Sequence, residues 1–274
     1  MTVGEALRAS TEHLAHKGVE QPRFDAELLL GRAFGLSRLE LYTQHDRPLT
    51  SAEADAGREL VARRGRREPL AHVLGDWGFR RLVLRTDARA LVPRPETEIV
   101  VERCLALLEG VEEPRIVDVG TGTGAIALAL KDERRDAVVL ATDVSADALD
   151  LARENAAVLE LDVAFVESSL LEGVDGPFDL VVSNPPYVRA GELEGLEPEV
   201  RDFEPRLALV EAGQTEALAR AARRVLAGPL VLEVHEEEAP QRRALLEQLG
   251  YRDVAVTLDL AGCERVVEGR WIPS

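Results

Sequence analysis

The chain has 274 residues, of which 46% are hydrophobic, so it can form a larger domain with a sizeable core and a smaller accessory domain. Its 33 basic and 50 acidic side chains give a formal net charge of −17. Residues 1–80 are balanced, with 12 of each sign, which leaves 21 basic and 38 acidic side chains in residues 81–274. The excess of negative charge in residues 81–274 would repel the phosphates of nucleic acid, so direct contact with DNA or RNA is not expected.

Other features bear on compartment and metal binding. No segment approaches the roughly 18 consecutive apolar residues of a membrane span, and no N-terminal stretch joins basic residues to an apolar run. The two cysteines, Cys104 and Cys263, are far apart in the sequence and are not expected to pair. We therefore expect a cytoplasmic, monomeric protein with no membrane partner. The five histidines show no ligand spacing, so no metal is expected.

Residues 1–75 predict a helical domain. Apolar residues recur at helical spacing in four segments: Val3–Lys17, Pro22–Phe34, Ser37–Thr43 and Ser51–Arg66. A cluster of basic side chains ends the fourth segment: Arg63, Arg64, Arg66 and Arg67. Either a solvated helix face or a contact surface for a partner protein fits this cluster. The whole domain fits either recognition of a substrate protein or a stabilising cap.

Residues 76–90 are expected to join the two domains. Pro69–Phe79 has the pattern of a linker, and Arg81–Leu84 predicts a short strand in a hairpin. Residues 91–274 then alternate strands and helices, which is typical of a doubly wound, mostly parallel α/β sheet. Strands are expected at Arg115–Val119, Val138–Asp143, Val163–Val166, Leu180–Ser183 and Pro229–Val234. After a helix at Ala239–Leu249, the segments Asp253–Asp259 and Glu264–Gly269 predict an antiparallel hairpin that reverses the last strand.

A glycine-rich loop follows the first of these strands. Gly120, Thr121, Gly122, Thr123 and Gly124 lie between that strand and an Ala/Leu-rich helix start. Glycines let the backbone approach a ligand, and a helix N-terminus offers unpaired N–H groups. The spacing G-x-G-x-G differs from the dinucleotide fingerprint G-x-G-x-x-G, which argues against a nicotinamide cofactor. Asp143, at the end of the next strand, could accept both ribose hydroxyls of a nucleoside.

A second motif ends the strand Leu180–Ser183. Asn184, Pro185, Pro186 and Tyr187 form a site suited to an NH2 group on a planar π system. The Asn184 side-chain carbonyl and the Pro185 backbone carbonyl could each accept one N–H, and Tyr187 could stack on the flat group. A plain turn is the alternative, because Asn-Pro is common turn punctuation.

Both motifs lie at carboxyl ends of strands, where open α/β sheets bind ligands. An adenosine-bearing cofactor beside an amine-orienting loop fits S-adenosylmethionine as a methyl donor. Catalysis would then depend mainly on positioning and electrostatics.

With these motifs, the chain resembles the HemK-type protein-(glutamine-N5) methyltransferases over nearly its whole length. Val92-Pro93-Arg94-Pro95-Glu96-Thr97-Glu98 is the most diagnostic match. Shorter matches are Asp25–Leu29, Pro69–Gly75, Phe203–Pro205 and Glu264–Val266. The resemblance implies a Rossmann-like methyltransferase domain with a reversed last strand, S-adenosylmethionine as cofactor, and class I peptide-chain release factors as substrates, methylated on the glutamine of the Gly-Gly-Gln loop.

The resemblance also implies roles for individual residues. Residues 120–124 would cradle the methionine end and ribose side of the cofactor, Asp143 would hold the ribose, and Asn184 would touch the cofactor. Asn184 and Pro185 would accept the glutamine amide hydrogens. Pro186, Tyr187 and Leu91 or Val92 would complete the substrate pocket.

The sequence departs from the family pattern at two places. Family members often have an acid followed by an aromatic residue where this chain has Ser169 and Leu170. These two residues would hydrogen-bond to and cover the adenine less tightly. His235 stands where a glycine is common, and is expected at a helix entry rather than in catalysis.

Two other functions are compatible with the motifs. The first is methylation of the exocyclic amine of adenine in DNA or RNA, which would use the same Asn-Pro-Pro-Tyr chemistry but predicts a basic target-recognition region and space for a flipped base. The second is a non-catalytic, cofactor-sensing partner of the translation machinery. The acidic second part and the match at residues 92–98 favour glutamine methylation.

Overall fold

The computed structural model describes residues 1–273, which form two compact units. One unit comprises Met1–Asp76 together with Leu196–Phe203, and the other comprises Trp77–Gly195 together with the chain from Glu204 onward. The segment Leu196–Phe203 thus belongs to the first unit although the sequence on both sides of it belongs to the second. The chain therefore passes between the units three times.

The first unit is helical, as predicted. Its helices are α1 (Val3–His16), α2 (Pro22–Phe34), α3 (Arg38–Thr43), α4 (Ser51–Gly65), α5 (Leu70–Leu74) and α9 (Pro198–Phe203). Three of them begin with a capping box, in which Thr2, Ser37 or Thr50 exchanges hydrogen bonds with a glutamate three residues later. Buried leucines from α1, α2 and α3 form its core, including Leu14, Leu29, Leu30 and Leu41.

Three arginines of the cluster at the end of α4, namely Arg63, Arg64 and Arg67, form ion pairs within this unit. Arg64 is only 6% exposed; its Nε lies 2.6 Å from Asp25 and its Nη1 2.7 Å from Glu199 of α9. Arg67 makes ion pairs with both Glu197 and Glu199. The expectation of a solvated helix face is therefore wrong for Arg64, which instead ties α4 to α2 and α9. These pairs could not be predicted from the sequence, because Glu199 lies more than a hundred residues away in the chain.

The expectation of a linker over Pro69–Phe79 is wrong in part. This stretch contains the one-turn helix α5 and the strand β1 (Asp76–Phe79), which pairs with β2 (Leu82–Arg85). The helix ends at Gly75, which takes the left-handed conformation with φ of 80°. Five helical residues are too few for hydrophobic periodicity to reveal. The short strand expected at Arg81–Leu84 is present as β2.

The second unit is built on a seven-stranded sheet with the order β5-β4-β3-β6-β7-β9-β8. Its strands are β3 (Arg115–Val119), β4 (Val138–Asp143), β5 (Ala164–Glu167), β6 (Leu180–Ser183), β7 (Pro229–Glu233), β8 (Arg252–Leu258) and β9 (Glu264–Arg270). The first five are parallel, and β9 runs antiparallel to both β7 and β8. The predicted mostly parallel sheet with a reversed last strand is confirmed.

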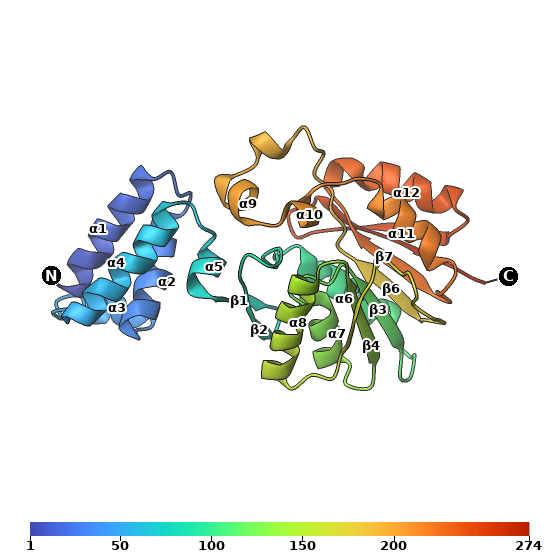
Figure 1. The fold of residues 1–274 in the computed structure, drawn as a ribbon, viewed down its shortest axis with the longest axis horizontal. Helices are drawn as coiled ribbons and strands as arrows, with labels where there is room; N and C mark the ends of the chain where they lie inside the picture. The colour runs from blue at the N-terminus through green and yellow to red at the C-terminus, as the bar shows by residue number, and fades with distance from the viewer. Residues whose placement is uncertain (274) are drawn as a thin grey trace. The chain divides into compact units, whose positions relative to one another are not determined.

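Helices cover both faces of this sheet (Figure 1). The unit's helices are α6 (Thr97–Leu107), α7 (Ala125–Glu133), α8 (Ala146–Leu159), α10 (Arg206–Leu209), α11 (Gln214–Ala222) and α12 (Ala239–Gln248), with 3-10 turns η1 (Leu193–Gly195) and η2 (Glu236–Glu238). Residues of α6 and α7 share one hydrophobic cluster with Ile116 of β3, whereas residues of α11 and α12 share another with Val117. Neighbouring residues of a strand face opposite sides, so β3 is buried by both layers.

Candidate active site

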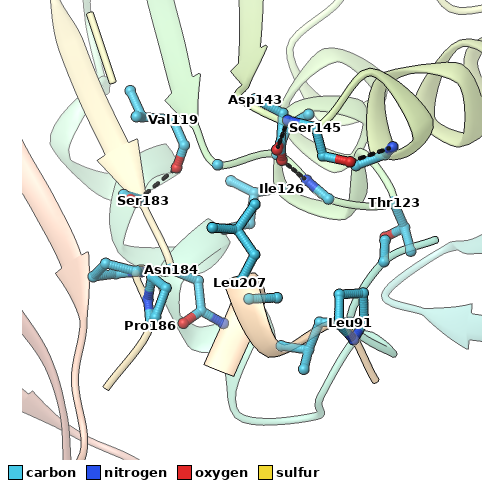
Figure 2. A pocket seen from close by; sticks show the side chains of 18 of the residues that line it. Leu91, Val119, Thr123, Ile126, Asp143, Ser145, Ser183, Asn184, Pro186 and Leu207 are labelled. Atoms are coloured by element: carbon cyan, nitrogen blue, oxygen red, sulfur yellow. Dashed lines mark hydrogen bonds between the residues drawn. The ribbon is translucent and has the colours of Figure 1, made fainter. Parts of the chain in front are cut away.

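A cavity lies at the carboxyl ends of β3, β4 and β6, within the second unit (Figure 2). Its walls come from the glycine loop, the residues after β4 and β6, the segment before α6, and α10 and α11. The lining residues that carry the argument below are Arg89, Leu91, Thr97, Gly120–Thr123, Asp143, Ser168, Leu170, Asn184–Pro186 and Leu207. Ten of the thirteen residues predicted for the site are among the lining residues; Gly124, Ser169 and Tyr187 are not.

The glycine loop has the conformation that its sequence requires. Gly120, Gly122 and Gly124 have φ values of 73°, 56° and 85°, in the left-handed region that disfavours other residues. Gly124 is the N-cap of α7, and a Cβ there would lie 2.9 Å from the Leu128 side chain. At Gly120 and Gly122 the loop thus presents bare backbone to the cavity, as a cradle for an extended ligand does.

Asp118 braces this loop from behind. Its Oδ2 accepts hydrogen bonds from Thr121 Oγ1 at 2.6 Å and from the Ala127 N–H at 3.2 Å. The residue is only 1% exposed, Oδ1 has no partner, and burial raises the pKa of the carboxyl to about 7. The sequence analysis assigned this acid no role. The available signal was an acid inside an apolar strand directly before a glycine loop.

Asp143 connects the glycine loop to the start of α8. Its Oδ2 accepts the Gly122 N–H and its Oδ1 accepts the Ser145 N–H, both at 2.9 Å. A carboxylate has about four acceptor positions, so two remain available at the cavity wall. This geometry fits the predicted binding of vicinal ribose hydroxyls.

Asn184 presents an unused acceptor. Its Nδ2 donates to Thr97 Oγ1 at 3.3 Å, whereas its Oδ1 is buried and has no partner among the described residues. Buried amide oxygens are normally hydrogen-bonded, so this one is a ligand-binding candidate. Pro185 and Pro186 line the cavity next to it and have no N–H that could compete for the acceptor (Figure 2).

Tyr187 lies partly buried beside this wall. Its ring centroid is 6.0 Å from that of His235, with a tilt of 39°. Burial raises the pKa of its hydroxyl. His235 Nδ1 accepts the Glu237 N–H at the start of η2, the helix-entry position expected for it.

The adenine-side residues are arranged differently from the prediction. Leu170 lines the cavity, but Ser169 is exposed and does not. Ser168, one residue earlier, is 7% exposed and does line it. Two adjacent serines cannot be told apart by sequence, because the choice depends on how the chain leaves β5.

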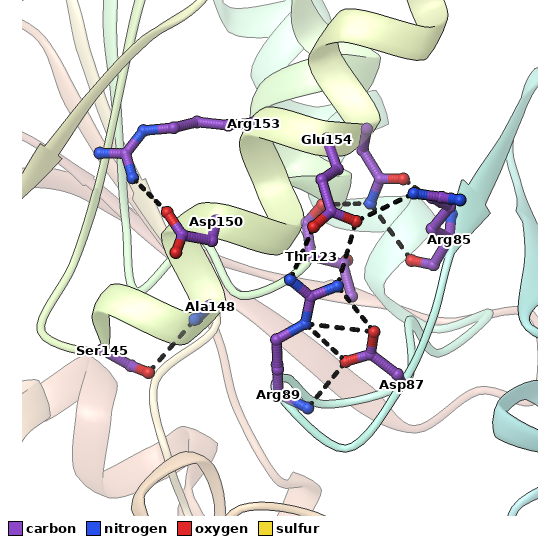
Figure 3. A network of polar contacts seen from close by, with 10 residues as sticks. Arg85, Asp87, Arg89, Thr123, Ser145, Ala148, Asp150, Arg153 and Glu154 are labelled. Atoms are coloured by element: carbon purple, nitrogen blue, oxygen red, sulfur yellow. Dashed lines mark hydrogen bonds and ion pairs between the residues drawn. The ribbon is translucent and has the colours of Figure 1, made fainter.

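A polar network holds the segment that carries Leu91 (Figure 3). Arg89 is hydrogen-bonded to the carboxylates of Asp87 and Glu154, with distances from 2.7 to 3.1 Å. The side chain of Asn155 is only 1% exposed. Its Oδ1 accepts the Arg85 N–H, and its Nδ2 donates to the Arg85 carbonyl and, at 2.9 Å, to the Thr123 carbonyl. The network therefore links β2, the glycine loop and α8.

Glu204 joins two of the sequence pieces that carried the resemblance. It is 5% exposed, accepts two hydrogen bonds from Arg94 at 2.8 and 2.7 Å, and accepts the Val92 N–H at 3.2 Å. The cavity wall at residues 92–94 is therefore tied to the chain just before α10.

No group of three or more potential metal ligands occurs in residues 1–273, and none of the helices in these residues has the length and apolar character of a membrane span.

Two family models match the chain. A PrmC N-terminal domain matches residues 5–75, and a methyltransferase small domain matches residues 97–196. The release factor glutamine methyltransferase of Deinococcus radiodurans is 45% identical over 279 residues, which cover 98% of this chain and 99% of that protein. The protein of the same name from Chlorobaculum tepidum is 41% identical over 281 residues, which cover 96% and 95%.

Among solved structures, the 16S rRNA N2 G1207 methyltransferase of T. thermophilus, in complex with AdoMet and guanosine, has a TM-score of 0.53 to this chain. The match covers 72% of this chain and 49% of that one at 18% identity, so it shows a shared fold alone.

Proposed function

Because the chain belongs to the release factor glutamine methyltransferases, we propose that it methylates the side-chain amide of the Gly-Gly-Gln glutamine in class I peptide-chain release factors, with S-adenosylmethionine as the donor. The observation that carries this proposal is the buried, unpartnered Asn184 Oδ1 in the same cavity as the glycine loop. An acceptor at that point suits an NH2 group whose lone pair must face a methyl donor.

The cofactor would occupy the half of the cavity between the ends of β3 and β4. The backbone of residues 120–124 would cradle its methionine end and ribose side, and Asp143 would accept the ribose hydroxyls. Leu170, with Ser168 or Ser169, would contact the adenine. When bound, S-adenosylmethionine supplies a methyl group on a positively charged sulfur, a good electrophile.

The glutamine amide would occupy the half at the end of β6. An amide nitrogen is a poor nucleophile because its lone pair is delocalised into the carbonyl. Asn184 Oδ1 and the Pro185 carbonyl would each accept one N–H, which turns the lone pair toward the methyl group. Pro186, Tyr187 and Leu91 would hold the glutamine stem. Transfer would form the N–C bond and break the C–S bond, and one N–H proton would leave to solvent.

We also propose boundaries and a setting for this activity. Residues 1–75 would recognise the release factor, residues 76–90 would connect the two domains, and residues 91–274 would carry out methyl transfer. The enzyme would act as a cytoplasmic monomer without nucleic acid or membrane partners. Methylation of adenine remains the second candidate, since Asn184 could orient its amine equally well; the acidic residues 81–274 argue against a phosphate-bearing substrate.

Methyl incorporation from labelled S-adenosylmethionine into three substrates separates these functions. The substrates are a class I release factor, the same factor with its Gly-Gly-Gln glutamine replaced by alanine, and an adenine-containing oligonucleotide. We expect label in the first alone. Label in the oligonucleotide without label in the factor would transfer the assignment to adenine methylation. Equal label in both factors would refute the glutamine as the target.

A further inference from the structure

Asn184 and Glu233 lie next to each other at the carboxyl ends of β6 and β7. Ser183, the last residue of β6, is in register with Leu232 of β7, and each is followed by one of these two residues. Glu233 is 2% exposed although it has a carboxyl group. Thr97, the first residue of α6 and 4% exposed, lies between their side chains through the contacts described next.

Thr97 interacts with both Asn184 and Glu233. Asn184 Nδ2 donates to Thr97 Oγ1 at 3.3 Å. The Thr97 side chain also interacts with the carboxyl of Glu233 and lowers the pKa of that carboxyl. Asn184 Oδ1 and Glu233 Oε2 have no partner among the described residues.

The direction of each bond follows from chemistry. An ionised carboxylate only accepts, so the Thr97 hydroxyl must give its single proton to Glu233. Its lone pair then faces Asn184 and can accept only from the NH2 edge of that amide. This leaves Oδ1 toward the cavity. Without the carboxylate, the Thr97 hydroxyl could turn and donate to Oδ1 of a flipped amide, since the two edges of an asparagine have nearly the same shape.

We propose that Thr97 and Glu233 are positioning residues that fix the orientation of the Asn184 amide, so that Oδ1 is presented to the substrate NH2 group. The flipped amide would offer an NH2 to an NH2, which cannot hydrogen-bond. This inference rests on the proposed function of Asn184 and extends it to two residues that do not react themselves.

The variants that test it remove or reverse the polar contacts of Thr97 and Glu233, and Thr97→Val and Glu233→Gln nearly conserve side-chain volume. Thr97→Val removes the hydroxyl and Thr97→Ser restores it. Glu233→Gln can donate to Thr97 and so releases the Thr97 proton toward Asn184. Thr215→Val is the matched control, because Thr215 is buried at 2% exposure in the first turn of α11 and does not line the cavity. Each is made in the wild type, and Thr97→Val also in Asn184→Ala.

The measurements are kcat with release factor, cofactor affinity by calorimetry and the thermal unfolding midpoint. They are made at about pH 8, above the pKa of Glu233, which burial raises to about 7. We expect Thr97→Val and Glu233→Gln to lower kcat by about tenfold to a hundredfold, as loss of an orienting partner does elsewhere. Cofactor affinity should stay within about twofold, and Thr97→Ser should recover most of kcat.

The Asn184→Ala background separates positioning from a general structural role. If Thr97 acts through Asn184, Thr97→Val should cause no further loss there. A kcat near wild type in Thr97→Val, a Thr97→Ser variant as impaired as Thr97→Val, or an undiminished further loss in Asn184→Ala would overturn the proposal. Should Thr97→Val not fold, Glu233→Gln is placed in the Asn184→Ala background instead and should likewise cause no further loss of kcat there. Failure of the wild type to methylate the factor would instead refute the proposed function.

Discussion

At the residue scale, Asp143 has one structural and one proposed binding role. Its two oxygens already accept the Gly122 and Ser145 N–H groups, so it shapes the glycine loop and the start of α8. Its remaining acceptor positions are proposed to hold the ribose hydroxyls. Asp147, one turn further along α8, is exposed and has neither role.

Replacing Asp143 with alanine should therefore weaken cofactor binding. A hydrogen bond to a charged group contributes roughly 1.5–3 kcal/mol, which corresponds to about a tenfold to hundredfold rise in Kd. Calorimetric titration with S-adenosylmethionine measures it, and Asp147→Ala provides the control. Equal Kd values for the two variants would show that Asp143 does not hold the cofactor.

Asp118 should make stability depend on pH. In the unfolded chain its carboxyl ionises near 3.8, but burial raises its folded pKa to about 7. Below about pH 4 the group is protonated in both states. Between about pH 4 and 7 the unfolded chain loses this proton first, so the free energy of unfolding falls by up to about 1.4 kcal/mol per pH unit, and above about pH 7 the fall ends.

The variant Asp118→Asn removes the titrating carboxyl, and with it this contribution to the pH dependence of stability, but keeps nearly the same side-chain shape. Urea unfolding of both proteins should show the stability of wild type, relative to the variant, declining as pH rises from about 4 to about 7. Glu233, whose pKa burial also raises to about 7, titrates in both proteins and cancels from the difference. A difference that does not change with pH would contradict the raised pKa of Asp118.

At the element scale, Arg64 in the last turn of α4 connects three helices of the helical unit. Arg64 lies between Asp25 of α2 and Glu199 of α9. Burial raises the pKa of Asp25 more than Arg64 lowers it, so the charge of Asp25 is costly even with its partner present. Arg66, in the same cluster, is exposed.

Replacing Arg64 with methionine should destabilise this unit by about 3–5 kcal/mol, because it leaves the Asp25 carboxyl buried without its partner. Arg66→Met is the control and should change the free energy of unfolding by less than about 0.5 kcal/mol. Urea unfolding of both variants measures the difference. Equal effects would mean that the Arg64 ion pairs contribute no net stability.

The sequence predicted most elements of both units and missed specific pairings. Strands β3, β4 and β6 were predicted with the bounds that the structure shows, because continuous apolar runs between turn signals indicate buried strands. Helix α5 was missed because it is one turn long. The attachment of Leu196–Phe203 to the first unit was missed because it depends on ion pairs between residues far apart in the chain.

In the candidate site, too, some residues could be predicted from the sequence and others could not. Asn184 and Asp143 could be proposed because each ends a predicted strand with a polar residue in a motif of recognisable chemistry. Thr97 and Glu233 could not be connected to Asn184 from sequence, because their contact depends on the register of β6 against β7. Sequence patterns thus located the groups proposed to meet the ligands, whereas the residues that orient those groups required the structure.

At the scale of the whole molecule, one sheet edge brings the two proposed ligands together. The ends of β3 and β4 carry the glycine loop and Asp143, and the neighbouring end of β6 carries Asn184 (Figure 2). A methyl donor and an amide held at adjacent strand ends need only alignment to react. In the proposed function, that alignment depends most on one unpartnered atom, Asn184 Oδ1.

The turnover of Asn184→Ala with a class I release factor tests this role most directly. At saturating cofactor, kcat should fall by about a hundredfold to a thousandfold, the loss typical of a preorganised polar group at a reacting centre. Cofactor Kd, measured in the same preparation, should change by no more than a few-fold. A variant that methylates the factor at a rate close to wild type would contradict the assignment of Asn184 as the group that orients the glutamine amide.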